Sequence, residues 1–227
     1  MLLISFIDEH FLLTLLGMGG IATYVWVDMH GERLGIGHFA ALVLTAACVF
    51  AGVACVKAFA FMESSGSAKG AMSLFGAVFF MPVLFVLGAK AFGRDAARVC
   101  DVLTPCMVFT VMCARINCLH AGCCHGIPIG GTGLQWPTRE IEIVYYVVFL
   151  VAVCGRVHAG VTRGEVYPEY MATYGAMRFC VEWVRYTSSH LIFHAAHVWA
   201  LLSLCLGASM YFEIKSQLSF RGGRSRR

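Results

Sequence analysis

Charged residues are scarce in this sequence. Only 13% of its 227 residues are Asp, Glu, Lys or Arg, whereas 59% are hydrophobic, and the mean hydropathy is +0.75. This composition excludes a water-soluble globular domain, in which about a quarter of the residues carry charge. The chain also lacks an internal repeat, a low-complexity linker and a stretch of soluble composition. We therefore expect a single integral membrane domain over residues 1–227.

A second absence concerns strands. No segment shows the ten-residue alternation of an outer-membrane barrel, whereas several stretches approach the roughly 20 apolar residues that a helix needs to cross a bilayer. The expected fold class is all-α, a polytopic transmembrane helical bundle of about seven spans. The predicted spans are Phe11 to Val27, His38 to Phe61, Ala71 to Phe92, Val99 to Leu119, Ile141 to Val157, Val166 to Val184 and Leu191 to Phe212.

Basic residues are unevenly divided between the two sets of loops. Seven spans place the termini on opposite sides of the membrane, and Lys and Arg concentrate in cytoplasmic loops. We therefore expect an external N-terminus and a cytoplasmic C-terminus, with a basic tail from about residue 213 that contacts anionic lipid rather than nucleic acid. The loops on the C-terminal side carry eleven basic residues: Arg33, Lys90, Arg94, Arg98, Arg156, Arg163, Lys215, Arg221, Arg224, Arg226 and Arg227. The other loops carry four: Lys69, Arg115, Arg139 and Arg185.

Polar residues crowd the end of the fourth predicted span, from Arg115 to Gly126. An arginine in the hydrocarbon core costs about 2.5 to 3.5 kcal/mol on insertion scales, so it usually faces a wet cavity or an anionic partner. Arg115 is therefore a candidate functional residue. Gly122 and Gly126 permit left-handed backbone conformations, which predicts a helix that runs into an irregular loop.

The sequence has eleven cysteines, of which eight lie inside predicted spans and are interpreted as small apolar side chains. Cys118, Cys123 and Cys124 differ because they lie at the predicted outer face beside His120 and His125. Thiolate and imidazole ligands suit zinc, so a metal site is one interpretation. A vicinal or 118-to-123 disulfide is another, since an external face is oxidising.

The sixth predicted span carries a polar stripe. Tyr174, Arg178, Glu182 and Arg185 are spaced by four, four and three residues, which places them on one face of a helix. Arg178 and Glu182 are expected to pair, so that both stay charged in an apolar setting. The stripe indicates either a structural ion pair or a site for an anionic headgroup, because guanidinium forks match phosphate.

Three motifs occur in a recognisable order. They are Arg115-Ile116 through Gly126, then Pro137-Thr138-Arg139-Glu140-Ile141-Glu142, then Tyr-Gly-x-x-Arg-Phe-x-x-Glu-Trp-x-Arg ending at Arg185. Together they resemble the prolipoprotein diacylglyceryl transferase family, over roughly Ala71 to Trp199. The chain has Phe75 where the family has a histidine and Cys123 where it has a glutamate. Ala121 replaces an asparagine, and Ala51-Gly52-Val53-Ala54 replaces a Gly-Ala-Arg motif.

The resemblance implies a multi-pass enzyme of the bacterial plasma (inner) membrane. Its partners would be phosphatidylglycerol, the signal peptide of a prolipoprotein with its lipobox cysteine, and the bilayer. The diacylglyceryl group would pass to that cysteine thiol and glycerol phosphate would leave. No cofactor, metal or nucleic acid is expected.

Residue roles follow from the same resemblance. Arginines would clamp the phosphate, Tyr174 would donate a hydrogen bond, Glu182 would orient an arginine or accept a proton, and His120 or His125 would replace the missing histidine as base. The predicted catalytic residues are Arg115, Tyr174, Arg178 and Glu182. The predicted substrate-binding residues are Asn117, His120, His125, Gly126 and Arg185. Two alternatives stay open: a relative that binds lipid or lipoprotein without transfer, and a membrane thiol-redox or metal protein that uses the Cys118 to His125 loop.

Overall fold

The structure is a computed structural model that describes residues 10–64, 73–186 and 193–224, the last five by their backbone only. Within these ranges it is helical, and the only β-type pairings are two isolated bridges. The expectation of an all-α fold is therefore confirmed for the described residues. The helices are α2 (Phe11–Met29), α3 (Gly31–Leu34), α4 (His38–Glu63), α5 (Phe75–Ala91), α6 (Ala96–His120), α7 (Thr138–Ala159), α8 (Val166–Glu182) and α9 (Ala195–Arg224).

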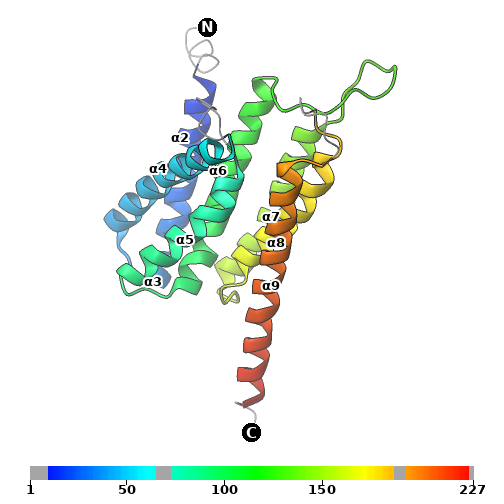
Figure 1. Ribbon diagram of the computed structural model, residues 1–227. Coiled ribbons are helices and arrows are strands. Elements are labelled where there is room, and N and C mark those ends of the chain that lie inside the picture. The colour runs from blue at the N-terminus through cyan, green and yellow to red at the C-terminus, as the bar shows by residue number, and fades with distance from the viewer. Residues whose placement is uncertain (1–9, 65–72, 187–192, 225–227) are drawn as a thin grey trace.

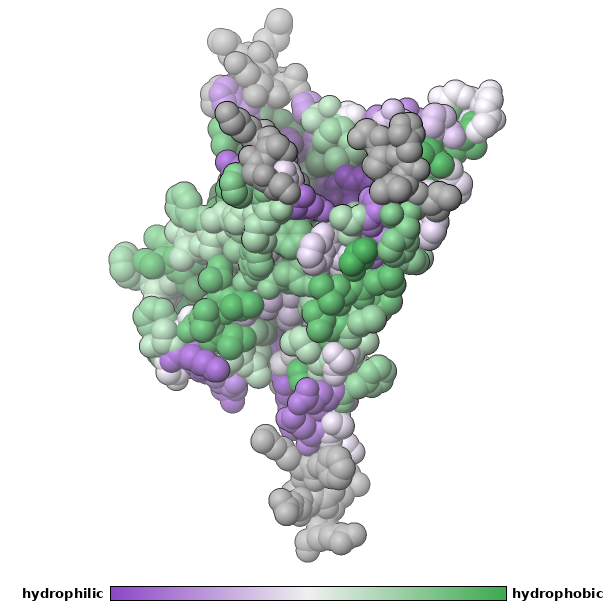
Figure 2. Space-filling view, in the orientation of Figure 1, coloured by the Kyte–Doolittle hydropathy of each residue, from purple (hydrophilic) through white to green (hydrophobic). Residues whose placement is uncertain are grey.

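The seven long helices coincide with the seven predicted spans, apart from shifts of up to four residues at their ends and an extension of α9 from the predicted end at Phe212 to Arg224. Five of them, α2, α4, α6, α7 and α9, are long and apolar enough to cross a membrane. With 17 residues each, α5 and α8 are about 25 Å long, shorter than the roughly 30 Å hydrocarbon core. The chain is a multi-pass membrane protein, and the count of seven spans stays a prediction. Figure 2 shows the apolar side chains as a broad band between two polar ends.

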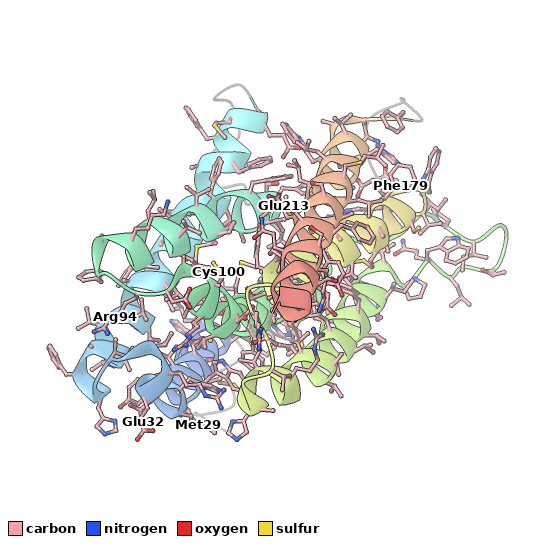
Figure 3. The ribbon with its side chains drawn as sticks, turned by 90° about the horizontal axis from the view of Figure 1, so that it is seen from below. Met29, Glu32, Arg94, Cys100, Phe179 and Glu213 are labelled. Atoms are coloured by element: carbon pink, nitrogen blue, oxygen red, sulfur yellow. The ribbon has the colours of Figure 1, made fainter. Side chains whose placement is uncertain are left out.

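The helices form two groups that are visible from the side and from below (Figures 1 and 3). One contains α2 to α6 and the other α7 to α9. α6 is the most buried of the candidate spans, because it packs against α2 and α5 within its own group and against α7 and α8 of the other. α2 begins at the upper end of the bundle in Figure 1 and α9 ends below it. Which end faces the cytoplasm stays a prediction.

The C-terminal helix is longer than the predicted seventh span. α9 continues past residue 213 to Arg224 and projects below the bundle (Figure 1), so the segment predicted as a basic tail is helical as far as the structure describes it. α9 follows α8 closely. A Cβ at Gly175 of α8 would lie 2.6 Å from the Ala200 carbonyl oxygen, and Ser203 donates a hydrogen bond to the Met171 carbonyl oxygen at 2.7 Å. Small residues at such a crossing let two backbones approach without apolar bulk between them.

A lower charge network joins the helices at the end where α9 projects; we define it as Asp101, Arg156, Glu165, Glu169 and Lys215. Asp101 accepts hydrogen bonds from the backbone N–H groups of Gly164 and Val166, at 2.7 and 3.1 Å, and so fixes the start of α8 against α6. Arg156 binds both carboxylate oxygens of Glu169, at 3.0 and 2.8 Å. Lys215 of α9 donates to Glu165 at 3.2 Å. Every acidic side chain of this network has a local partner.

Candidate functional site

The upper end of the bundle contains a buried cluster of charges, which we call the upper cluster and define as Arg115, Glu142, Arg178, Glu182 and Arg185. Glu142 lies at its centre, with Arg115 Nε 2.6 Å from one carboxylate oxygen and Arg178 Nη1 3.2 Å from the other. Arg178 also pairs with Glu182 at 2.6 Å, as the four-residue spacing predicted. The side chains of Arg115, Glu142, Arg178 and Glu182 are at most 7% exposed. Charges so deeply buried stay ionised only through such partners.

Arg185 reaches the upper cluster by a different route from the predicted one. α8 ends at Glu182, so Arg185 lies beyond the helix rather than on its polar face. Its backbone forms an antiparallel bridge with Gly126, and the flanking hydrogen bond from Ile127 N to Val184 O measures 2.8 Å. The Arg185 guanidinium lies 3.7 Å from Glu142. The irregular loop after α6 therefore holds this arginine in place.

Sequence reasoning missed two members of this site. Glu142 was quoted only as part of a motif, although it is 1% exposed and contacts three arginines. A carboxylate in the second turn of an otherwise apolar span is itself a signal of function. His194 lies outside the quoted motifs, and its Nε2 is 2.8 Å from Glu182. No local pattern around His194 indicated this contact.

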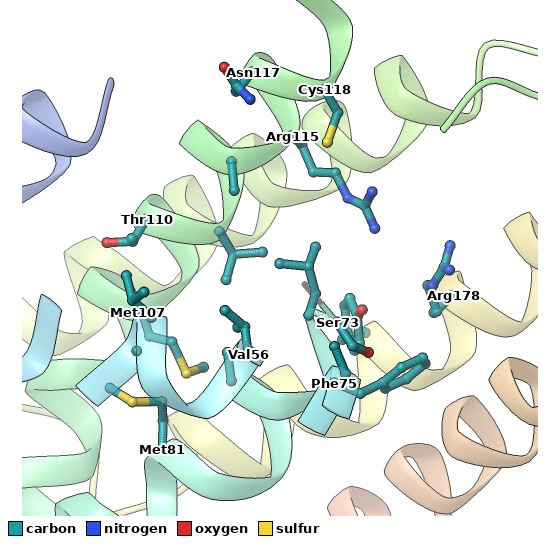
Figure 4. A pocket seen from close by; sticks show the side chains of 18 of the residues that line it. Val56, Ser73, Phe75, Met81, Met107, Thr110, Arg115, Asn117, Cys118 and Arg178 are labelled. Carbon is teal, nitrogen blue, oxygen red and sulfur yellow. The ribbon is translucent and has the colours of Figure 1, made fainter. Parts of the chain in front are cut away.

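A cavity of about 580 Å³ adjoins the upper cluster, a volume typical of small-molecule and lipid-headgroup sites. Figure 4 shows the guanidinium groups of Arg115 and Arg178 near each other at one side of it, with Met81 and Met107 at the other side. Its polar end is lined by Arg115, Arg178, Glu182, Arg185 and His194, and its apolar end by residues such as Leu16, Val53, Met81, Phe85 and Met107. The cavity is therefore amphipathic, as a site for a phospholipid must be.

The upper cluster carries more positive than negative charge. Three guanidinium groups share the two carboxylates of Glu142 and Glu182. Each guanidinium presents five N–H donors, more than two carboxylates can occupy with good geometry. The arrangement can accept a further anion such as a phosphate at the cavity.

The family model described as prolipoprotein diacylglyceryl transferase matches residues 16–213. The chain belongs to that family. No curated protein matches it. Membership indicates a general role as a prolipoprotein diacylglyceryl transferase, which acts on lipid and prolipoprotein at a membrane.

Phe75, which stands where the diacylglyceryl transferase family has a histidine, forms part of the cavity wall. Phe75 is buried, its ring centroid lies 5.9 Å from that of Tyr174, and the Arg178 guanidinium carbon lies 5.9 Å from its centroid. An aromatic ring at that distance can attract a guanidinium but cannot accept a proton. The Tyr174 hydroxyl is buried with no hydrogen-bond partner among the described residues. Tyr174 is therefore free to donate to a ligand in the cavity.

The remaining predicted substrate-binding residues divide into two groups. Asn117 lines the cavity, and Gly126 is buried where a Cβ would lie 2.5 Å from Trp136 Cβ and 2.9 Å from the Val184 carbonyl oxygen. Gly126 thus acts through close backbone approach. His120 is exposed, and its ring centroid lies 4.2 Å from that of Phe11 with the rings tilted by 32°. The ring centroid of His125 lies 5.2 Å from that of Tyr186. Neither histidine is among the residues that line the cavity, and the expectation that one of them replaces the missing base stays a prediction.

The three loop cysteines come together beside the upper cluster. The sulfurs of Cys118, Cys123 and Cys124 all lie within 4.8 Å of one another, and all three are free thiols rather than the disulfide considered from the sequence. Cys118 and Cys124 line the cavity. A hydrogen bond from the Cys118 thiol, with help from the charges of Arg185 and Arg115, lowers the pKa of Cys124 to about 4. Among the described residues, these three cysteines are the one cluster whose ligand atoms lie close enough together to hold a metal ion.

Proposed function

We propose that the chain transfers a diacylglyceryl group from phosphatidylglycerol to the lipobox cysteine of prolipoproteins. In this reaction the acceptor sulfur forms a bond to the terminal glycerol carbon of the diacylglyceryl group. The bond between that carbon and the phosphate oxygen breaks, and its electron pair leaves with glycerol phosphate. The acceptor thiol gives up one proton. The observation that carries this proposal is the amphipathic cavity with surplus guanidinium groups at one end.

The upper cluster has the chemistry that this leaving group requires. Negative charge grows on the phosphate as the carbon–oxygen bond breaks, and fixed donors aimed at that charge stabilise the transition state. We assign this role to Arg115, Arg178 and Arg185, whose guanidinium groups are held by Glu142 and Glu182 before the lipid arrives. Tyr174 adds a hydrogen bond from its unpaired hydroxyl. The apolar end of the cavity takes the acyl chains.

The direct test is transfer by purified protein. Labelled phosphatidylglycerol and a lipobox peptide are incubated with the protein, and a peptide with serine in place of the acceptor cysteine is the control. Label is expected on the cysteine peptide alone. Label on both peptides, or on neither while a known transferase works in the same assay, would exclude the proposed reaction.

A second candidate function is favoured by Phe75. Because a phenyl ring fills the position of the family's histidine, the chain can be read as a relative that binds phospholipid without transferring it. Native mass spectrometry distinguishes the two. Phosphatidylglycerol that stays bound and intact after incubation with acceptor peptide supports the binding protein, whereas turnover supports the transferase.

We further propose that the protein lies in the bacterial inner membrane with the upper cluster near the outer leaflet. This orientation rests on the excess of basic residues in the loops of the lower end. Single cysteines at Gly130 and Ser225, in a background without Cys118, Cys123 and Cys124, test it by labelling intact cells with an impermeant reagent. Labelling at Gly130 alone is expected, and labelling at Ser225 alone would reverse the orientation.

A further inference from the structure

The three loop thiols form a compact and prebuilt group. Cys118 lies in the last turn of α6, and Cys123 and Cys124 lie in the loop that follows. Cys123 N donates to the Cys118 carbonyl oxygen at 3.2 Å, so the chain folds back to bring the sulfurs together. Cys118 and Cys124 line the cavity, and Cys123 is exposed. An ion can therefore reach the group from outside while the group itself faces the substrate site.

Cys124 adopts an unusual backbone conformation for this arrangement. It has φ of 59°, the one positive value at a non-glycine residue among those the structure describes. Such a conformation is unfavourable for an L-residue and persists where the surroundings impose it. Here Thr138 Oγ1 donates to the Cys124 carbonyl oxygen at 3.0 Å, and Tyr186 N donates to the next carbonyl oxygen, of His125, at 3.1 Å. The fold thus maintains a strained residue whose effect is to aim a thiol at Cys118.

We propose that the sulfurs of Cys118, Cys123 and Cys124 bind one Zn²⁺ whose fourth position opens into the cavity. Zinc–sulfur bonds of about 2.3 Å place tetrahedral ligands about 3.8 Å apart, so sulfurs within 4.8 Å need to shift by no more than about 1 Å. Three thiolates leave the site with a net negative charge. Arg115 and Arg185 line the same cavity as Cys118 and Cys124, so their positive charges offset it. Three protein ligands with one open position are typical of catalytic rather than structural zinc.

The open position suits the acceptor thiol, and this part of the inference rests on the proposed function. A thiol that coordinates zinc loses its proton, which here passes to solvent at the exposed side of the loop. The resulting sulfur anion lies beside the arginines that hold the phosphate, and it attacks the glycerol carbon as the carbon–oxygen bond to phosphate breaks. The ion thereby supplies the activation that Phe75 cannot provide. The family resemblance implies no metal, whereas the three sulfurs within 4.8 Å of one another favour one.

The binding claim is tested without any measurement of transfer. Protein is purified under reducing conditions, stripped with a chelator, titrated with Zn²⁺ and assayed for bound metal by mass spectrometry. We expect one zinc per chain in wild type, none in Cys118→Ser/Cys124→Ser, and one in Cys205→Ser, which removes an exposed cysteine of α9. Cobalt in place of zinc should give a sulfur-to-metal absorption band in the near ultraviolet. Wild-type protein that binds no stoichiometric zinc and gives no such band overturns the site, whatever its activity.

The open position is tested with the cobalt form. Addition of a lipobox peptide should shift the visible cobalt bands, and the same peptide with serine should not; equal spectra with both peptides overturn the acceptor role. If zinc activates the acceptor, stripping should reduce transfer at least tenfold and added zinc should restore it. Undiminished transfer by the stripped enzyme overturns the role of zinc and leaves the proposed function intact. If the protein binds zinc but transfers no labelled lipid, the proposed function is excluded and the zinc site is supported.

Discussion

The two ends of the bundle treat charge in different ways. In the lower charge network Asp101 accepts hydrogen bonds from two backbone N–H groups. Arg156 donates to both carboxylate oxygens of Glu169, and Lys215 donates to Glu165. In the upper cluster a single carboxylate, Glu142, serves three arginines beside a cavity of about 580 Å³. Both sets join the same three helices, α6, α7 and α8. The lower set is saturated by local partners, whereas the upper set retains donors for a ligand.

This contrast separates a structural use of ion pairs from a functional one within one chain. A saturated pair fixes helices together and gains nothing from a further anion. Arginines that outnumber their carboxylate partners are held in place by those partners and keep N–H donors that can bind phosphate. Burial and ion pairing occur at both ends and do not distinguish the candidate site. The upper cluster differs because its arginines have more N–H donors than its carboxylates can accept, and because it adjoins the cavity.

The largest effect is expected at Glu142. Glu142→Ala leaves Arg115 and Arg178 without their shared anion and should lower the free energy of unfolding by about 3 to 5 kcal/mol. The matched change in the lower network, Glu169→Ala, should cost about 1 kcal/mol or less, because Arg156 is partly exposed. Unfolding in detergent measures both. Equal losses would remove the distinction between the two ends, and recovery of stability in Glu142→Ala/Arg115→Ala would attribute the loss to the unpaired charge.

The next effect concerns guanidinium geometry. Arg178→Lys keeps a positive charge but loses the planar fork, so transfer of labelled diacylglyceryl should fall by about 100-fold while the melting temperature changes little. Arg156→Lys makes the same substitution in the lower charge network and should transfer at the wild-type rate. A wild-type rate in Arg178→Lys, with the protein folded, would exclude the upper cluster as the phosphate clamp.

A smaller effect follows from the lowered pKa of Cys124, about 4. Because its thiol is already ionised above that pH, alkylation of Cys124 in metal-free protein should hardly change between pH 6 and 8. An ordinary thiol, with a pKa of about 8.5, should react about tenfold faster per pH unit over that range. Peptide mapping by mass spectrometry follows Cys124 beside a cysteine placed at Gly130 in the exposed loop. Parallel pH profiles for the two would contradict the effect of Cys118 and the arginines.

The smallest effect is expected at Glu165 in the lower charge network. Burial raises the pKa of this carboxyl, but hydrogen bonds from the Arg163 N–H and Lys215 outweigh burial and lower it overall. Ionised Glu165 therefore stabilises the fold above its unfolded pKa, and this contribution is lost as the pH falls through the lowered folded value. Glu165→Gln should cost about 1 kcal/mol at pH 7, and the gap to wild type should narrow as the pH falls below the unfolded pKa of about 4.3. A constant gap in melting temperature from pH 7 to pH 3.5 would contradict this.

The sequence was sufficient for whatever depends on local pattern. Hydropathy placed the seven long helices, and the four-residue spacing predicted the Arg178–Glu182 pair. It was insufficient where contacts cross between helices. Nothing near Glu142 indicates that Arg115 and Arg185 converge on it, because that depends on how α6, α7 and the segment after α8 are packed.

Loop residues were the hardest to assign. His120 and His125 resembled replacement bases because they neighbour the thiols in sequence, yet their rings pack on Phe11 and Tyr186. The sequence drew attention to the three thiols, but it did not predict that their sulfurs lie within 4.8 Å of one another. That convergence accompanies the positive φ of Cys124, which is not anticipated at a cysteine.

Glu142 also bears on how a product would depart. When no lipid is bound, this carboxylate is the internal counter-ion of the arginines, so an arriving phosphate must take guanidinium groups away from it. In the proposed reaction the same exchange would run backwards after transfer, when Glu142 would compete with glycerol phosphate for those groups. An arginine pocket without a competing carboxylate would hold its leaving group more tightly, so Glu142 would favour release of the product.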